Sequence, residues 1–378
     1  MIPLSLYIHI PWCIQKCPYC DFNSHQKKGD LPEIAYVERL LSDLKQDIER
    51  FNIKRPLHSI FIGGGTPSLF SAHAYELLFK GIQALLPFND SIEITMEANP
   101  GTVEQQRFKA YRELGINRLS LGIQSFNPIH LKKLGRIHDD KEALLAIDAS
   151  VKAGFDNFNL DIMHGLPNQT LDEGLNDLKT AISLSPTHLS WYQLTLEPNT
   201  VFYKTRPTLP HDETLEQLEN EGLALLKQHG FERYEISAFA KTPKQAKHNL
   251  NYWTFGDYLG IGAGAHGKVT DTKTYQITRT QKHRLPKDYL NPDKTAFIQT
   301  PPLTVSDIIF EFMLNTTRLE AAIPFSLFTT QTGLTFDLLK PGLLQAQNKG
   351  LILMAENSWQ ITPFGRRFTN DLQTLFID

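Results

Sequence analysis

The chain has 378 residues, of which 41% are hydrophobic and 21% charged, and its formal net charge is −3. This composition is typical of a globular protein with a large core, and the small net charge gives no electrostatic basis for binding nucleic acid or an anionic membrane. No apolar run reaches the roughly 20 residues of a transmembrane segment, and the N-terminus lacks a basic secretory signal, so we expect a cytoplasmic protein.

The first half of the chain alternates short β-rich runs with amphipathic runs. The predicted strands span residues 4–10, 58–62, 91–97, 117–123, 157–162 and 187–194, and the predicted helices between them span 34–50, 72–86, 103–114, 141–153 and 171–184. Six βα units of this length favour parallel strands with right-handed crossovers. The predicted fold is α/β, with a partial (β/α)6 TIM-like barrel; an open doubly wound sheet is the alternative.

The pattern changes after residue 196. A polar, proline-containing stretch leads to a predicted helix near 215–229, and from about residue 301 three predicted helices precede a hairpin near 350–361, which resembles a winged helix. We therefore predict a barrel (1–196), a barrel extension (197–300) and a small C-terminal α+β winged-helix-like domain (301–378). That last domain has five Lys and Arg against seven Asp and Glu. A DNA-binding role would need a basic face, so we expect no nucleic-acid partner.

The chain's three cysteines, Cys13, Cys17 and Cys20, lie within eight residues directly after the first predicted strand. An odd, clustered set cannot form a self-contained disulfide framework. Three thiolates at this spacing can hold three irons of a four-iron cluster and leave the fourth open. The alternative is a zinc site completed by His9 or His25, although zinc sites usually draw ligands from two separated pairs. The position after a barrel strand favours a reaction centre.

The spacing Cys-x3-Cys-x2-Cys resembles the signature of the radical S-adenosylmethionine (SAM) superfamily. Longer segments are more specific: YIHIPWCIQKCPYCDFNS, FIGGGTPS, EANP, LGIQSF, LGRIH and NLDIMHGLP resemble, in this order, the branch that contains oxygen-independent coproporphyrinogen III oxidase and the HemW heme chaperones. The resemblance covers roughly residues 4–268. It implies a [4Fe–4S] cluster with SAM on its open iron, and a low-potential electron donor such as flavodoxin or ferredoxin.

The resemblance also implies SAM-binding residues at the ends of the predicted strands. Gly64, Gly65 and Thr66 follow the second strand, where glycine lets the backbone approach a ligand closely. Glu97 would pair with an ammonium or with ribose hydroxyls, and Arg136 would bind the SAM carboxylate. The remaining implied contacts are Tyr7, Gln124 and Asp161. Taken singly, each of these residues also has a plain structural interpretation.

Two differences from the oxidases and one motif of the heme chaperones distinguish the members of this branch. The oxidases carry a further cysteine two residues after the third, where this chain has Phe22, and a longer N-terminal arm than this chain has. The segment HNLNYW at 248–253 resembles the HNxxYW signature of the heme chaperones. A neutral His248 imidazole is a suitable axial ligand for heme iron, and Tyr252 and Trp253 can pack on the macrocycle. The structural alternative is a histidine buried by two aromatic rings.

The glycine-rich run 260–267 could suggest a dinucleotide-binding loop. The sequence indicates neither a clear strand before it nor a helix with an acidic residue about 20 positions after it, so close packing of the backbone beside a cofactor or the core is the simpler interpretation.

The favoured hypothesis is a heme chaperone that binds heme and delivers it to apo-hemoproteins, with the cluster and SAM needed for assembly or transfer. The alternative is an oxygen-independent coproporphyrinogen III oxidase, which would decarboxylate propionate side chains by radical hydrogen abstraction. The sequence leaves open whether SAM is cleaved or only bound, and therefore whether the chain is an enzyme.

Overall fold

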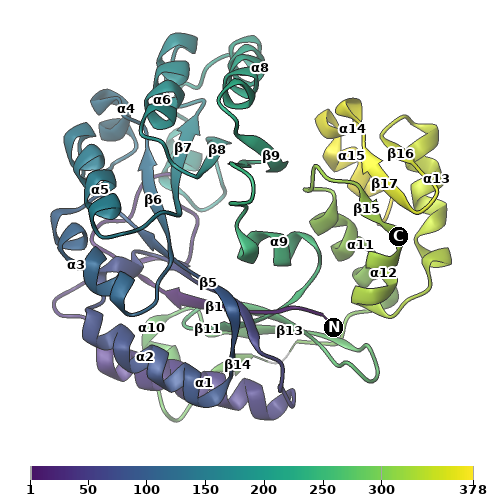
Figure 1. Ribbon diagram of the computed structural model, residues 1–378, viewed down its shortest axis with the longest axis horizontal. Helices are drawn as coiled ribbons and strands as arrows, with labels where there is room; N and C mark the ends of the chain where they lie inside the picture. The colour runs from purple at the N-terminus through teal and green to yellow at the C-terminus, as the bar shows by residue number, and fades with distance from the viewer. Residues whose placement is uncertain (1, 299, 378) are drawn as a thin grey trace.

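The structure is a computed structural model that describes residues 2–298 and 300–377, apart from the side chains of residues 102–104. It has a large α/β unit and a smaller C-terminal unit (Figure 1). The predicted βα pattern is confirmed: six parallel strands follow each other in the sheet in chain order. They are β1 (Leu4–Ile10), β4 (Leu57–Gly64), β5 (Phe88–Ala98), β6 (Arg118–Gln124), β7 (Phe158–His164) and β8 (His188–Gln193).

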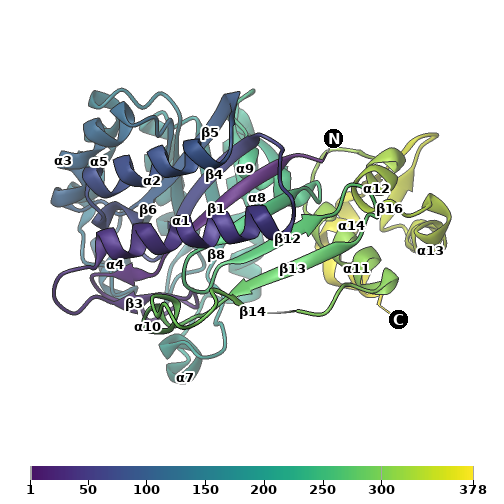
Figure 2. The same ribbon diagram turned by 90° about the horizontal axis from the view of Figure 1, so that it is seen from below.

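Helices connect these strands and cover the outer side of the curved sheet (Figures 1 and 2). They are α1 (Glu33–Arg50), α2 (Ala72–Leu85), α3 (Thr102–Glu113), α5 (Asp140–Lys152) and α6 (Leu171–Ser183), with the short 3-10 turn η1 (Pro67–Leu69) and helix α4 (Pro128–Lys133), which the sequence did not predict. The start of α6 is set by a capping box, in which the Thr170 and Glu173 side chains bind each other's backbone N–H groups.

The six predicted barrel strands are extended at both edges of the same sheet by strands between residues 232 and 298, which the sequence did not predict. At one edge β11 (Asp257–Ile261) pairs parallel with β1 and is followed by the antiparallel strands β12 (His266–Thr270), β13 (Ile277–Lys282) and β14 (Phe297–Ile298). At the other edge β10 (Ala238–Ala240) and β9 (Glu232–Glu235) continue from β8. These strands are short, with two to six residues each. The connecting helices are α7 (Val201–Thr205), α8 (Asp212–Gln228), α9 (Lys247–Trp253) and α10 (Pro286–Tyr289).

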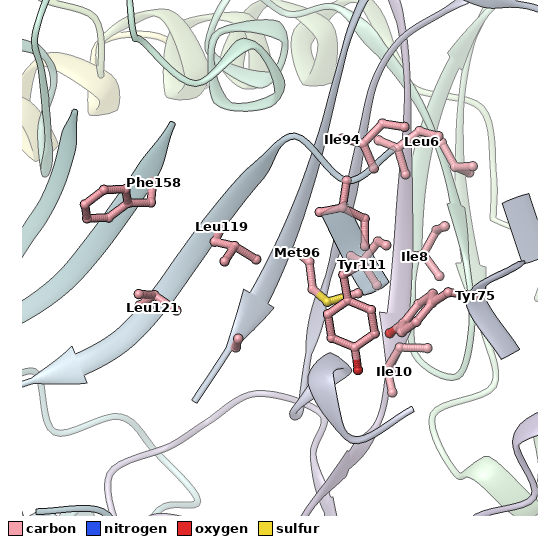
Figure 3. Packing of buried hydrophobic residues seen from close by; sticks show 14 of the residues in the cluster. Leu6, Ile8, Ile10, Tyr75, Ile94, Met96, Tyr111, Leu119, Leu121 and Phe158 are labelled. Carbon is pink, nitrogen blue, oxygen red and sulfur yellow. The ribbon is translucent and has the colours of Figure 1, made fainter. Parts of the chain in front are cut away.

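The alternation of side chains along β1 separates the core from the interior of the partial barrel. Leu6, Ile8 and Ile10 are fully buried in the layer between sheet and helices, and Figure 3 shows them along one side of the strand near Tyr75 and Tyr111. Burial of each such aliphatic side chain contributes about 1.5–3 kcal/mol. The intervening residues of a strand point to the opposite face, which here is the inside of the barrel.

The C-terminal unit confirms the predicted order of a winged helix. Helices α11 (Val305–Thr316), α12 (Phe325–Thr332) and α13 (Lys340–Asn348) precede the hairpin of β16 (Ile352–Met354) and β17 (Ser358–Ile361), with β15 (Ile323–Pro324), η2 (Phe336–Leu338), α14 (Pro363–Arg367) and α15 (Thr369–Thr374) completing the unit. Its core is centred on Phe312, Phe328 and Trp359, includes Phe255 and Ile277 of the barrel extension, and forms a cluster separate from the barrel core. Within the described residues, no helix has the length and apolarity needed to cross a membrane.

Candidate functional site

The three cysteines lie on one loop that begins at the C-terminal end of β1. The two-residue strands β2 (Trp12–Cys13) and β3 (His25–Gln26) pair at the base of this loop and close it. Within it, the Cys20 N–H donates a hydrogen bond to the Cys17 carbonyl at 3.2 Å. The three thiols are free and half-buried, and all three line one cavity. We call this space the cluster cavity.

The cluster cavity brings together most of the residues that the sequence predicted for cofactor binding. It lies at the C-terminal ends of the parallel strands, where barrels of this type carry out chemistry. Its lining includes the predicted Cys13, Cys17, Cys20, Gly64, Gly65, Thr66, Glu97, Gln124, Arg136 and Asp161. Tyr7 is the exception among the residues predicted for the cluster and SAM, because it lines a neighbouring cavity.

The turn after β4 is tied to the cysteine loop by backbone hydrogen bonds. The Gly65 N–H donates to the Ile10 carbonyl at 2.8 Å, and the Thr66 N–H donates to the Trp12 carbonyl at 2.7 Å. Gly64 has a φ of +115°, and a Cβ placed on it would lie 2.5 Å from the His9 ring. Only glycine fits this position, since both the left-handed φ and the lack of space exclude a side chain. Gly64 is therefore required by its packing against His9, which agrees with the interpretation as a tight turn, and the approach of this backbone to SAM stays a prediction.

Two carboxylates face the cluster cavity from β5 and β7. Glu97 accepts a hydrogen bond from the Gly64 N–H at 3.0 Å, and Asp161 accepts hydrogen bonds from Ser120 Oγ at 3.0 Å and Asn159 Nδ2 at 2.9 Å. Burial, together with the charge of Asp161, raises the pKa of Glu97 to about 7. Burial also raises the pKa of Asp161, against its hydrogen bonds. Two carboxylates whose ionised forms are both disfavoured will gain from a cationic ligand.

Arg136 and Gln124 line the same space, and in the described part of the chain each has a buried polar atom without a partner. The Arg136 guanidinium donates to Asn99 Oδ1 and the Gly122 carbonyl, each at 2.7 Å, and lies 3.8 Å from the Cys17 sulfur. Among the described residues, its Nε and the Gln124 Oε1 are buried without a hydrogen-bond partner. Gln124 also has a φ of +66°, which is uncommon for a residue with a side chain. Such unsatisfied, strained groups are typical of binding sites.

These groups fit the cofactors that the sequence resemblance implies. SAM carries a sulfonium and an ammonium, which match the two carboxylates, and a carboxylate, which matches the Arg136 guanidinium. No three His, Cys, Asp or Glu side chains in the described part of the chain are arranged around one metal-ion position. A four-iron cluster, in contrast, binds its cysteines through different irons. When bound, such a cluster supplies an iron with an open coordination position and a low-potential electron.

The sequence reasoning missed several residues of the cavity. Asn99, Ser120 and Tyr192 line it beside the predicted set. Ser120 precedes Gln124 by four positions on β6, so both point to the same face of the strand. The inward alternation of each strand was the signal that could have identified Ser120. Asn99 lies just beyond the end of β5, and its amide donates to Thr66 Oγ1 at 2.9 Å.

A second cavity lies beside the cluster cavity, on the side of β1, β11 and β12. Its lining residues are Tyr7, His9, Phe22, Asn23, Gly64, Glu97, Tyr252, Tyr258, Gly264, His266, Gln281 and Arg284. Phe22, Gly64 and Glu97 line both spaces. Phe22 stands where the resembling oxidases have a cysteine, and 62% of it is exposed. The second cavity, of about 710 Å³, therefore opens next to the cysteine loop.

The structure separates the three residues of the HNxxYW segment. Tyr252 lines the second cavity. His248 lies behind it and is 1% exposed, with Nδ1 hydrogen-bonded to Ser59 Oγ at 2.9 Å and Nε2 to the Tyr252 hydroxyl at 2.8 Å. Burial lowers the pKa of His248 to about 3, so its ring is neutral. Trp253 points elsewhere, and its ring packs under the Arg318 guanidinium at 4.3 Å.

The glycine-rich run 260–267 connects β11 and β12. The expectation that no strand precedes it was wrong, because β11 ends at Ile261; a strand rather than a helix follows, so a dinucleotide-binding loop is still not formed. The expected close packing is confirmed: a Cβ on Gly262 would lie 2.3 Å from the His9 carbonyl, and one on Gly264 would lie 2.3 Å from the Asn23 amide.

The comparisons with known proteins agree with this geometry. Residues 7–181 match the radical SAM superfamily, and residues 303–368 match the HemN C-terminal domain. The chain is 53% identical to the heme chaperone HemW of Haemophilus influenzae and 50% identical to that of Escherichia coli, in each case over 99% of this chain and 98% of the relative. Its fold is similar to that of coproporphyrinogen III oxidase (HemN) from Escherichia coli, with a TM-score of 0.81 at 24% identity, over 99% of this chain and 90% of the other.

The matches to these two chaperones extend over the barrel, its extension and the C-terminal unit. A more distant relative, the heme chaperone HemW of Bacillus subtilis, is 35% identical over 99% of this chain and 99% of its own length. With this identity along the whole chain and a cysteine loop that lines one cavity, the protein belongs to the HemW family of heme chaperones, within the radical SAM superfamily.

Proposed function

We propose that this protein binds heme and delivers it to apo-hemoproteins in the cytoplasm. Membership of the superfamily implies a [4Fe–4S] cluster and SAM, and we assign the cluster to Cys13, Cys17 and Cys20. The observation that carries the proposal is a large cavity beside the cluster cavity in a chain whose full-length relatives are named heme chaperones. A porphyrin in that cavity would lie against the wall that Phe22 shares with the cysteine loop.

The SAM-binding assignments follow from charge and position. We propose that Glu97 and Asp161 face the cationic groups of SAM, that Arg136 binds its carboxylate, and that the turn of Gly64, Gly65 and Thr66 lies against it. The polar atom of Gln124 that lacks a partner supports its inclusion as a further contact. A reducing partner such as flavodoxin or ferredoxin would supply electrons to the cluster.

The alternative is oxidation of coproporphyrinogen III. The fold likeness to HemN, at 24% identity, concerns the fold alone. Phe22 in place of a cysteine weighs against this alternative, as does the higher identity to heme chaperones along the whole chain.

The experiment compares the two functions in one preparation. The protein is reconstituted anaerobically with iron and sulfide, loaded with heme and SAM, and mixed with an apo-cytochrome of the b type. We expect heme to appear on the cytochrome faster than from the same amount of heme in free solution. Coproporphyrinogen III given to the same reduced preparation should stay unchanged. Formation of protoporphyrinogen, or a wild-type protein that binds no heme, would overturn the proposal.

A further inference from the structure

The second cavity differs from the cluster cavity in the chemistry of its walls. Aromatic rings line it from three directions: Tyr7 on β1, Phe22 on the cysteine loop, and Tyr252 and Tyr258 on α9 and β11. Broad aromatic surfaces of this kind pack on flat apolar molecules. The cavity volume of about 710 Å³ lies within the roughly 300–1,000 Å³ of pockets that enclose small-molecule ligands. The cavity therefore suits a large planar ligand.

Two imidazoles line this cavity, and they differ in their partners. His9 Nδ1 is hydrogen-bonded to the Tyr7 hydroxyl and its Nε2 to the Asn23 carbonyl, both at 2.9 Å. His266, the first residue of β12, is exposed and has no side-chain hydrogen bond within the described residues. Burial and the nearby Arg279 and Arg284 guanidinium groups lower the pKa of His266. The lowered pKa favours the neutral ring, whose unprotonated nitrogen has a free lone pair for a metal.

Arg284 supplies a cation at the same cavity. Its side chain is exposed and forms no ion pair or hydrogen bond in the part of the chain that the structure describes. Its backbone, however, is fixed, because the Asn23 amide donates to the Arg284 carbonyl and to the Ala263 carbonyl, each at 2.8 Å. Asn23 directly follows Phe22, so the cysteine loop itself holds this edge of the cavity. A guanidinium here can pair with a carboxylate of a ligand.

We propose that the second cavity is the heme site, with His266 as the axial ligand of the iron, Arg284 paired with a propionate, and Phe22 packed on the macrocycle. The inference rests on the proposed function and names the site through which it would act. It differs from the sequence-based assignment of the ligand to His248, whose two ring nitrogens are both hydrogen-bonded in the interior. In this arrangement His248 positions Tyr252, and Tyr252 forms part of the cavity wall.

The test titrates ferric heme into the cluster-loaded, SAM-bound full chain and follows difference absorption spectra and EPR. We expect a histidine-ligated spectrum for wild type and for His248→Gln. His266→Ala should lose that spectrum and bind heme about tenfold or more weakly, and added imidazole should restore the spectrum because it can fill the vacated position. His229→Ala, which changes an exposed histidine at the end of α8, is the matched control and should behave as wild type.

A second arm tests the propionate contact. Arg284→Ala should weaken heme binding by about tenfold but leave the binding of heme dimethyl ester unchanged, because the ester has no charge to pair. Lys45→Ala, at an exposed position on α1, should affect neither ligand.

The outcomes separate this inference from the function on which it rests. A His266→Ala protein that keeps the wild-type spectrum while His248→Gln loses it would overturn the site and leave the heme-binding function intact. Equal loss of ester and heme binding in Arg284→Ala would overturn the propionate contact. Wild type without any heme binding would overturn the proposed function itself.

Discussion

Two sets of polar side chains inside the partial barrel differ in how completely they are paired, although among the described residues Asn251 Oδ1 and Trp253 Nε1 on α9 are also buried without partners. In the cluster cavity, Arg136 Nε and Gln124 Oε1 are buried without partners, and burial raises the pKa of Glu97 and Asp161. Farther from the strand ends, around α9, Ser5 is hydrogen-bonded to Ser59, Ser59 to His248, and His248 to Tyr252.

The difference teaches how to distinguish a binding surface from a structural interior. An unpaired buried group costs about 1–3 kcal/mol, which a ligand can recover by pairing with it. A closed chain of hydrogen bonds gives no such gain, so a ligand would have to break it. By this criterion we expect ligands in the cluster cavity and a structural role for His248, although a motif singled out His248 just as clearly.

The largest expected effect is at the cysteine loop. Replacing Cys13, Cys17 and Cys20 together with serine should abolish the brown chromophore after anaerobic reconstitution, and iron should fall from about four per chain to almost none, since no thiolate is left to bind it. Iron and sulfide analysis with absorption spectra measures this. Ile14→Ala, in the same loop and 46% exposed, should keep the full cluster. A serine variant that still forms the cluster would contradict its assignment to this loop, and with it the distinction between the cluster cavity and the hydrogen-bonded interior around His248.

The second effect is on stability and concerns the paired interior. His248→Ala should lower the free energy of unfolding by about 2–4 kcal/mol, because it opens a cavity and leaves the Ser59 and Tyr252 hydroxyls without their partner. Urea denaturation measures the change. The matched control is His73→Ala on the surface of α2, which should stay within about 0.5 kcal/mol of wild type. If His248→Ala is as stable as the control, the hydrogen-bonded network around His248 contributes nothing to the free energy of unfolding.

The third effect is a pH dependence of the cluster cavity. The pKa of Glu97 is about 7 in the folded chain, so its charge, and with it the attraction to SAM, appears as pH rises through 7. We expect SAM to bind about tenfold more tightly at pH 8 than at pH 6, and Glu97→Gln to remove this difference. Calorimetric titration of the cluster-loaded protein measures both. Asp161→Asn should move the midpoint to lower pH, because it removes a charge that raises the pKa of Glu97.

The raised pKa of Glu97 affects the stability of the ligand-free protein in the direction opposite to its effect on SAM binding. Between the ordinary glutamate pKa of 4.5 and about 7, the folded chain holds a proton that the unfolded chain has released, so stability falls as pH rises across this window. Glu97→Gln should therefore be more stable than wild type at pH 8. The exposed Glu219→Gln on α8 is the control and should show neither effect.

The smallest effect concerns Trp253, the third residue of the HNxxYW segment. The Arg318 guanidinium packs on the Trp253 ring and pairs with Glu235 at 2.9 Å, so Arg318 links the C-terminal unit to the barrel extension. Arg318→Ala should lower the free energy of unfolding by about 1 kcal/mol and leave heme affinity unchanged. Denaturation and heme titration test both parts. Arg367→Ala, which breaks an exposed ion pair, should have a smaller effect still.

Local patterns in the sequence determined the barrel strands, the helices between them and the cysteine loop. Alternation in β1 and the helical periodicity of α1 and α2 are properties of neighbouring residues, so they can be read without a structure. The family resemblance added the strand-end residues, and Glu97, Gln124 and Asp161 do meet in one cavity. Their convergence follows from parallel strands, whose carboxyl ends lie at one edge.

Only the tertiary structure decided what lies beside and behind that cavity. The strands β9–β14 join a sheet formed by residues far away in sequence, and their pairing depends on contacts that no local pattern records. The same holds for the two histidines, which have the same side chain but different surroundings. His248 is enclosed by Ser59 and Tyr252, whereas His266 lines an open cavity. A side chain's available lone pair is set by its neighbours in space, and these are fixed by packing.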